Sequence, residues 1–162
     1  MPTSAPPQIL SRPLQGKRIL VVEDDAALAA DLCRGLADLG ATIVGPAPTP
    51  FYAISLLGRR GVDAAVLDIH LYRTDVFEVA RELLARKIPM IFASADPLDV
   101  LPAPYRHCPI VQKPIDPRQV QAILAQKTLA PAQEKTAPPS DQSSGPGDRL
   151  MRAVVRSLRL PN

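Results

Sequence analysis

The sequence predicts a doubly wound α/β domain, in which parallel strands form one sheet and helices cover both of its faces. Short apolar runs of strand length alternate along the chain with longer segments whose apolar residues recur at helical spacing. This alternation implies parallel strands joined by right-handed helical crossovers. In sheets of this kind, ligands bind at the carboxyl ends of the strands.

Five segments are predicted to be buried strands because each is short and almost wholly apolar. They are residues 17–23, 42–45, 63–68, 89–94 and 110–112. The first segment ends in Glu23, and the third and fourth end in Asp68 and Ser94. Polar side chains are therefore expected where the strands end.

Four segments are predicted to be helices, and capping residues mark where they begin. Asp25 is expected to cap the first helix, while Thr49 and Asp116 each precede a proline, which suits the first helical position. Thr74 or Asp75 is expected to cap the third helix. The four segments are residues 26–39, 50–60, about 75–86, and 117–127.

The stretch 96–109 interrupts this alternation. It contains four prolines, which exclude a long regular helix because proline lacks a backbone donor and clashes with the preceding turn. A single turn around 98–101 is the most that we expect. The fourth helix of the alternation, between the fourth and fifth strands, is therefore predicted to be degenerate.

Composition divides the chain into four parts. Residues 1–16, broken by prolines, are predicted to be a disordered N-terminal arm, and residues 17–127 form the folded domain. Residues 128–147 are rich in Pro, Ser and Gln and should be a flexible linker. Residues 148–162 regain helical periodicity and are predicted to form a short basic amphipathic helix.

The positive charge of the chain is concentrated in this last segment. Its arginines and single aspartate give +3, which equals the net charge of the whole sequence. The rest of the chain is therefore neutral, and we expect no direct DNA binding. The segment is expected to bind an acidic partner surface or to dimerise, with an anionic membrane or docking on the folded domain as open alternatives.

We expect neither a membrane span nor a secretory signal in this sequence. It has no apolar run of roughly 18 residues, which a membrane span requires, and no secretory signal at its start. Cys33 and Cys108 lack the spacing of a metal site and are interpreted as free thiols in a reducing compartment. We therefore expect a cytoplasmic protein.

Polar side chains gather at the predicted strand ends. Glu23 and Asp24 belong to the first strand end, Asp68 and Ser94 close the third and fourth strands, and Lys113 follows the fifth. Three carboxylates at one edge repel one another and need a cation to remain ionised. Their oxygens suit Mg²⁺ (or Mn²⁺), which would also neutralise a phosphoryl group, while the lysine and the hydroxyl could hold its oxygens.

Four motifs resemble those of response-regulator receiver domains of two-component signalling, of the single-domain, chemotaxis-regulator type. They are residues 21–25 (VVEDD), 66–68 (VLD), 92–95 (FASA) and 112–114 (QKP). The resemblance covers about residues 17–127. It implies a flavodoxin-like fold with strand order 2-1-3-4-5 and a protein that signals through protein–protein interaction rather than an enzyme.

The resemblance also implies roles for the site residues. Asp68 is the phosphoacceptor, which receives a phosphoryl group from a histidine kinase or a histidine phosphotransfer protein and assists its own phosphorylation and dephosphorylation. Ser94 and Lys113 contact the phosphoryl group, and the bond from Lys113 to Pro114 is expected to be cis. The implied metal ligands are Glu23, Asp24, Asp68 and the backbone carbonyl of His70.

Two features depart from the family pattern. The interval from Ser94 to Lys113 is shorter than usual, in keeping with a degenerate fourth helix. Ile110 stands where many receivers have a Tyr or Phe that swings inward on phosphorylation, and Ile115 stands where Phe is common. We therefore expect intact site chemistry without the usual aromatic readout, and a response in the loop 95–109 instead.

Other classes of protein remain as alternatives. A phosphorylation-independent, receiver-like adaptor would typically have lost the acceptor, an acidic partner or the lysine, all of which remain here. A metal-dependent phosphotransfer or nucleic-acid-cleaving enzyme would need a second acid two residues after Asp68, where His70 stands. A flavin or nucleotide site is disfavoured because the acidic residues 23–25 would repel phosphate.

Overall fold

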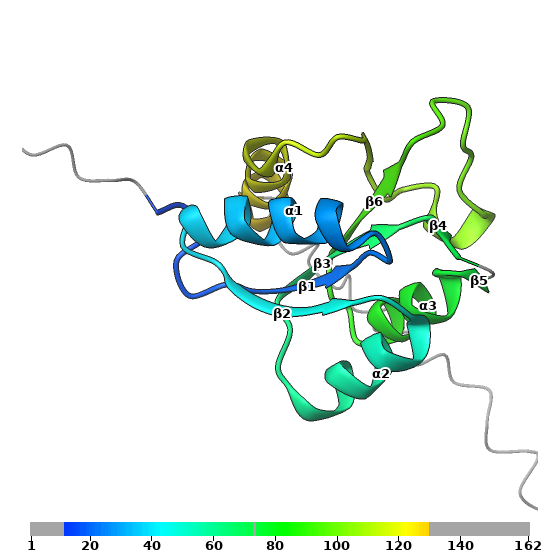
Figure 1. Ribbon diagram of the computed structural model, residues 1–162, viewed down its shortest axis with the longest axis horizontal. Helices are drawn as coiled ribbons and strands as arrows, with labels where there is room; N and C mark the ends of the chain where they lie inside the picture. Colours follow the sequence, from blue (N-terminus) through cyan, green and yellow to red (C-terminus); the bar gives the residue numbers. More distant parts are fainter. Residues whose placement is uncertain (1–11, 73, 130–162) are drawn as a thin grey trace, which may run out of the picture. The chain divides into compact units, whose positions relative to one another are not determined.

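The apolar segments of the chain fold into strands and helices close to the positions that their periodicity predicts (Figure 1). The computed structural model describes residues 12–72 and 74–129. The chain divides into two units, 1–131 and 132–162, and all described residues lie in the first. The elements are β1 (Arg18–Val22), α1 (Ala26–Asp38), β2 (Thr42–Ala47), α2 (Pro50–Arg59), β3 (Ala64–Asp68), β4 (His70–Leu71), β5 (Thr74–Asp75), α3 (Phe77–Ala85), β6 (Met90–Ser94), the 3₁₀ helix η1 (Ala103–Tyr105), β7 (Ile110–Gln112) and α4 (Pro117–Leu129).

Five of the strands form one parallel sheet in the order β2-β1-β3-β6-β7. This confirms the predicted order 2-1-3-4-5, in which only the strands of the main sheet are counted. Every residue of the central strands β3 and β6 is buried. Because both faces of these strands are covered, their sequences are continuous apolar runs rather than alternating ones.

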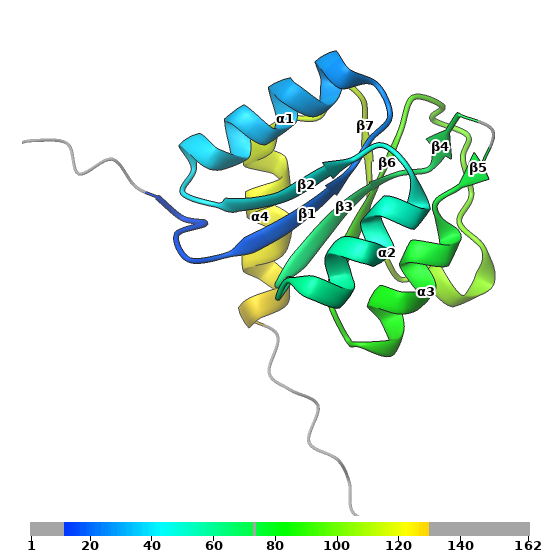
Figure 2. The ribbon, with the colours of Figure 1, turned by 60° about the horizontal axis from the view of Figure 1, so that its bottom comes forward.

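Helices cover both faces of the sheet, as expected for this fold class (Figure 2). α1 and α4 lie on one face, and α2 and α3 lie on the other. Each face has its own apolar core. One core contains Leu36 of α1 and Val120 of α4, and the other contains Leu57 of α2 and Leu83 of α3. The two cores fix the strands, and with them the positions of the strand ends.

The predicted capping residues begin three of the helices. Asp25 and Thr49 accept hydrogen bonds from backbone N–H groups in the first turns of α1 and α2. Asp116 Oδ1 lies 2.8 Å from Arg118 N at the start of α4. Local sequence signals therefore place these three helix starts correctly.

The predicted start of α3 is wrong. Thr74 and Asp75 do not cap the helix but form β5, which pairs antiparallel with β4 in a small hairpin. α3 begins at Phe77, whose N–H donates to Asp75 Oδ1 over 2.9 Å. Each strand of the hairpin has two residues, too few to show an alternating pattern in the sequence.

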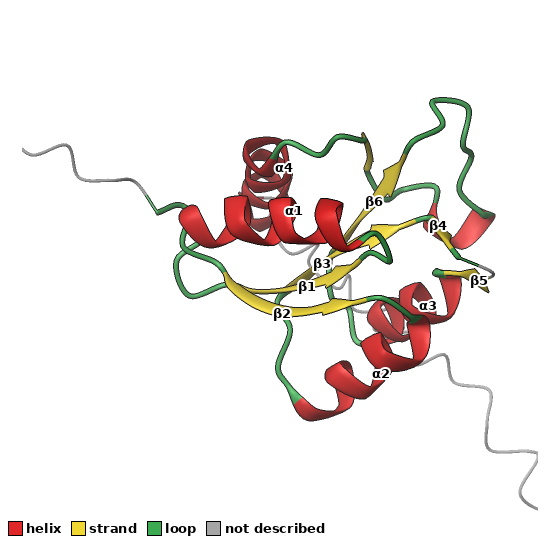
Figure 3. Cartoon of the chain, in the orientation of Figure 1, coloured by secondary structure: helices red, strands yellow, loops and turns green. Residues whose placement is uncertain are grey.

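The chain between β6 and β7 contains no α-helix, as predicted (Figure 3). Its helical turn is η1 and not the turn expected at 98–101. Pro104 suits the start of η1, because a residue in the first helical turn needs no backbone donor. Leu101 and Tyr105 are 4% and 7% exposed and belong to the same core cluster as α2 and α3. These two side chains help to cover the sheet where no α-helix lies between β6 and β7.

Part of the predicted N-terminal arm belongs to the folded domain. Residues 13–16 form a turn in which Leu14 is only 3% exposed. Leu14 N donates to Leu39 O over 3.0 Å, which fastens this turn to the end of α1. An arm reaching to residue 16 is therefore wrong. At the other end, α4 extends to Leu129, beyond its predicted end at 127.

Three predicted segments lie outside the described residues: the arm over 1–11, the linker from 130 onward and the basic helix 148–162. Within the described ranges, no helix has the length and hydropathy needed to cross a membrane. Cys33 and Cys108 are free thiols.

Candidate functional site

The side chains predicted to form the site lie together at the carboxyl edge of the sheet. Glu23 and Asp24 follow β1, and Asp68 and Ser94 are the last residues of β3 and β6. Lys113 follows β7. Because β3 lies between β1 and β6, and β7 lies beside β6, the parallel strands deliver all five residues to one edge.

Lys113 bridges two buried carboxylates. Its Nζ lies 2.7 Å from Glu23 Oε2 and 2.6 Å from Asp68 Oδ2. Glu23 and Asp68 are each 4% exposed. A backbone N–H holds the other oxygen of each carboxylate: Asp25 N lies 3.1 Å from Glu23 Oε1, and His70 N lies 3.1 Å from Asp68 Oδ1. One ammonium group is thus shared between two buried anions.

The shared ammonium changes the proton affinity of the groups around it. Burial raises the pKa of Glu23 above its usual range, although hydrogen bonds from Lys113 and the backbone of Asp25 oppose this. Burial alone would lower the pKa of Lys113, but the hydrogen bonds to Asp68 and Glu23 outweigh it and raise that pKa. Lys113 is therefore a fixed positive charge. A second cation nearby would stabilise the ionised form of Glu23, which burial disfavours.

The carboxylates next to Lys113 could hold such a cation. Glu23, Asp24 and Asp68 each offer an oxygen, and these three atoms all lie within 4.8 Å of one another. Asp24 Oδ2 accepts a hydrogen bond from the Tyr72 backbone over 2.6 Å, which orients this half-buried carboxylate. Three carboxylates beside one ammonium group leave excess negative charge, and all the side-chain atoms that could bind a metal here are oxygens. The residues present therefore fit Mg²⁺, which prefers oxygen ligands.

Ser94 is engaged by an acidic residue that the sequence did not indicate. Ser94 Oγ donates to the carboxylate of Asp99 and lies 2.9 Å from both Asp96 O and Asp96 N. The His70 ring reaches the same carboxylate, with Nε2 2.8 Å from Asp99 Oδ2. The hydrogen bond from Ser94, with a smaller contribution from His70, lowers the pKa of Asp99, although burial opposes this. A second anion, Asp99, therefore lies beside the hydroxyl of the site.

Curated proteins share part of this sequence. No protein-family model matches the chain. Over 80 residues it is 35% identical to a protein-glutamate methylesterase/protein-glutamine glutaminase of Anaeromyxobacter dehalogenans and 30% identical to the transcriptional regulatory protein PdtaR of Mycobacterium tuberculosis. These matches cover 48% and 49% of this chain, but only 22% and 39% of the two relatives. The chain thus spans less than half the length of either protein.

Solved structures share the fold. SdrG from Sphingomonas melonis Fr1 is 35% identical, with a TM-score of 0.60 over 67% of this chain and 93% of that chain. The response regulator PhyR from Brucella abortus is 29% identical, with a TM-score of 0.60 over 72% of this chain and 49% of its own. A response regulator receiver domain from Methylobacillus flagellatus, 24% identical, has the same TM-score over 68% and 97% of the two chains. The chain belongs to the receiver-domain family of response regulators.

The receiver domain has the cis peptide bond predicted between Lys113 and Pro114, and a second one, between Gly45 and Pro46, that was not predicted. The backbone N–H of His70 donates a hydrogen bond to the Asp68 carboxylate. A metal-binding role for the His70 carbonyl stays a prediction.

Asp99 is the residue of the receiver site that sequence reasoning missed. It lies in a proline-rich stretch with neither helical nor strand periodicity, so no pattern pointed its side chain toward the site. The one feature of the sequence that could have indicated Asp99 is its closeness to Ser94 in the chain. A loop residue near a predicted site can reach it without any periodic pattern.

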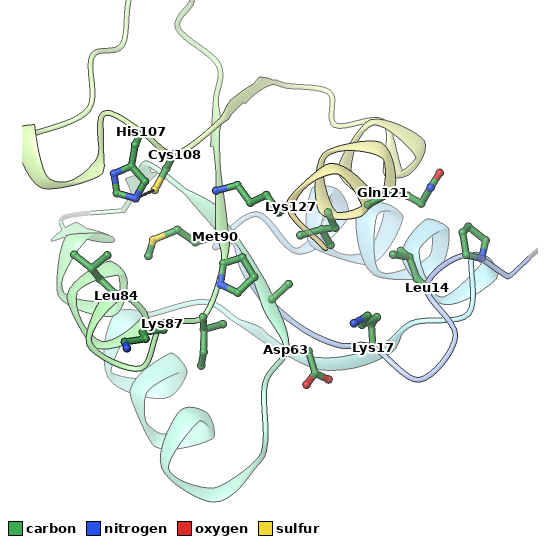
Figure 4. Close-up of a pocket in the computed structure, with 16 residues that line it drawn as sticks. Leu14, Lys17, Asp63, Leu84, Lys87, Met90, His107, Cys108, Gln121 and Lys127 are labelled. Atoms are coloured by element: carbon green, nitrogen blue, oxygen red, sulfur yellow. Dashed lines mark hydrogen bonds between the residues drawn. The ribbon is translucent and has the colours of Figure 1, made fainter. Parts of the chain in front are cut away.

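A cavity in the described part of the receiver lies at the opposite edge of the sheet (Figure 4). It has a volume of about 840 Å³, and its lining includes Ala64 and Met90, the first residues of β3 and β6. Leu14 and Leu124 form part of its apolar wall. The acidic cluster is at the carboxyl edge of the same sheet, so this cavity is not the candidate metal site.

Proposed function

We propose that this receiver domain accepts a phosphoryl group on Asp68 from a histidine kinase or a histidine phosphotransfer protein, with the help of Mg²⁺ or Mn²⁺, and signals through protein–protein interaction. One observation carries the proposal. The Asp68 carboxylate is buried at a strand end, it is bound by Lys113, and it shares a possible cation site with Glu23 and Asp24.

Each residue has a defined task in this reaction. A carboxylate oxygen of Asp68 attacks the phosphorus atom, and the bond from phosphorus to the donor's leaving group breaks, with its electron pair departing on that group. Lys113 and Ser94 would then hold phosphoryl oxygens. Glu23, Asp24, Asp68 and the His70 carbonyl would hold the metal ion, which when bound neutralises charge on the phosphoryl group.

A phosphorylation-independent adaptor is the second candidate. Two observations favour it: the Ser94 hydroxyl is already engaged by Asp99, and Ile110 provides no aromatic ring for the usual readout. Against it, the acceptor, the acidic pair and the lysine are all present at one edge of the sheet. The labelling experiment below separates the two candidates.

Incubation with acetyl phosphate or phosphoramidate is expected to phosphorylate the protein only when Mg²⁺ or Mn²⁺ is present. Intact-protein mass spectrometry would measure this, and Asp68→Asn should abolish the added phosphoryl group because the nucleophilic oxygen is lost. Asp38→Asn, at the exposed last residue of α1, is the matched control and should label as the wild type does. Labelling that persists in Asp68→Asn would contradict the acceptor assignment, and a folded wild type that never labels would favour the adaptor.

The affinity for Mg²⁺ should depend on Asp24 and not on its neighbour Asp25. Asp24→Asn is expected to weaken Mg²⁺ binding about tenfold or more in isothermal titration calorimetry, because a direct oxygen ligand loses its charge. Asp25→Asn removes a charge from the next residue but keeps a good cap for α1, so a much smaller change in Mg²⁺ affinity is expected. Equal losses in the two variants would mean that general charge, and not ligation, attracts the ion.

A further inference from the structure

The Ser94 hydroxyl has a hydrogen-bonding arrangement with room for only one acceptor of its proton. Ser94 is fully buried, and the Asp96 N–H already donates to its oxygen over 2.9 Å. The hydroxyl has a single proton to give, and the nearby acceptors are the Asp96 carbonyl and the Asp99 carboxylate. An anionic acceptor makes the stronger bond, so Asp99 is the preferred partner.

We propose that Asp99 is a positioning residue that holds the Ser94 hydroxyl in the unphosphorylated domain and competes for it with the phosphoryl group on Asp68. The inference rests on the proposed function, since it assumes that Asp68 is phosphorylated. It adds a residue and a regulatory contact that neither the predicted site nor the acceptor chemistry includes.

The competition has two physical causes. First, Ser94 cannot donate to Asp99 and to a phosphoryl oxygen at the same time, because it has one proton. Second, a phosphoryl group adds about 1.5 to 2 negative charges near the Asp99 carboxylate, and like charges in a partly buried site repel. Phosphorylation must therefore break the bond between Ser94 and Asp99, and that bond opposes phosphorylation to the same extent.

The second contact of Asp99 links the acceptor loop to the segment 95–109. His70 lies two residues after Asp68, and its ring nitrogen Nε2 is 2.8 Å from Asp99 Oδ2. Asp99 thus joins Ser94 of β6 and His70 of β4 through one carboxylate. When the Ser94 hydroxyl turns away from Asp99, one of these two side-chain contacts of the Asp99 carboxylate is lost.

Release of Asp99 would change the part of the protein surface formed by its two neighbours in the chain. Its neighbours Leu98 and Val100 are 82% and 79% exposed, whereas Leu101 is 4% exposed and anchors the loop in the core. A change at Asp99 therefore shifts two exposed apolar side chains while the anchor stays. Such a pair could be read by a partner protein without an aromatic switch at position 110.

Beryllofluoride, a phosphoryl mimic that binds with Mg²⁺, tests the competition. Its half-saturating concentration would be measured by NMR titration for the wild type, Asp99→Asn, Ser94→Ala and the double variant. Asp99→Asn is expected to bind beryllofluoride about tenfold more tightly, because a neutral amide holds Ser94 less strongly and does not repel the mimic. In the Ser94→Ala background, Asp99→Asn should raise the affinity for beryllofluoride much less, since no hydroxyl remains to be released.

Asp96→Asn is the matched control. It removes one negative charge from the same loop, but only the backbone of Asp96 contacts Ser94, and its carboxylate instead accepts from Leu98 N. Its affinity for beryllofluoride should stay near that of the wild type. The inference is overturned by unchanged affinity in Asp99→Asn, by an equal gain in Asp96→Asn, or by an undiminished gain in the Ser94→Ala background. A wild type that binds no beryllofluoride would overturn the proposed function together with this inference, so the two failures can be told apart.

Discussion

Phe92→Ala is expected to lower the free energy of unfolding by about 3–5 kcal/mol, the range for removal of a buried aromatic ring. Phe92 lies in the middle of β6, is fully buried and pairs with both neighbouring strands. Its ring centroid is 6.0 Å from that of Phe77 in α3 and 5.9 Å from that of Tyr105 in η1. Urea denaturation followed by circular dichroism would measure the loss.

This loss should be large because Phe92 connects the sheet to the segment between β6 and β7, which has no α-helix. Tyr105 stacks on Phe77 at 5.6 Å, so removing Phe92 leaves two rings facing a cavity. Phe51→Ala is the matched control: Phe51 is 84% exposed and its removal should change the free energy of unfolding by less than about 0.5 kcal/mol. Similar effects of the two substitutions would mean that the aromatic cluster is not part of the core.

Lys113→Met is expected to destabilise the metal-free protein by about 3 kcal/mol, the lower end of the range for breaking a buried ion pair. The variant keeps the length of the side chain but leaves the carboxylates of Glu23 and Asp68 without their ammonium partner. The lower end applies because the Lys113 side chain is 15% exposed. Thermal or urea unfolding without Mg²⁺ would measure the effect.

Mg²⁺ should restore more stability to Lys113→Met than it adds to the wild type, because the cation can neutralise the same carboxylates. Lys127→Met, at an exposed position of α4, is the control and should change stability little with or without the metal. If Lys113→Met is as stable as the wild type without Mg²⁺, then the buried carboxylates do not depend on this lysine and the charge argument for the site is wrong.

The sequence by itself determined the sheet and the placement of the predicted site. Strands of continuous apolar residues can be buried on both faces only in a covered parallel sheet, and polar residues at the ends of such strands must meet at one edge. Glu23, Asp68 and Lys113 are far apart in the chain, yet this rule brings them within hydrogen-bonding distance. The caps Asp25, Thr49 and Asp116 are equally local signals, because each acts on its own next helical turn.

The tertiary structure alone decided the features that depend on contacts without periodicity. Leu14 stands in a proline-broken segment, and it is buried because it packs into the core that contains Leu36 and Val120. The β4–β5 hairpin is too short to produce a pattern. Asp99 reaches Ser94 and His70 because the loop 95–109 is anchored by Leu101 and Tyr105, and a loop's path is set by such anchors rather than by its own residue order. In a periodic segment, the spacing of the residues determines which face each side chain points to. In an irregular segment, the surfaces on which it packs determine this.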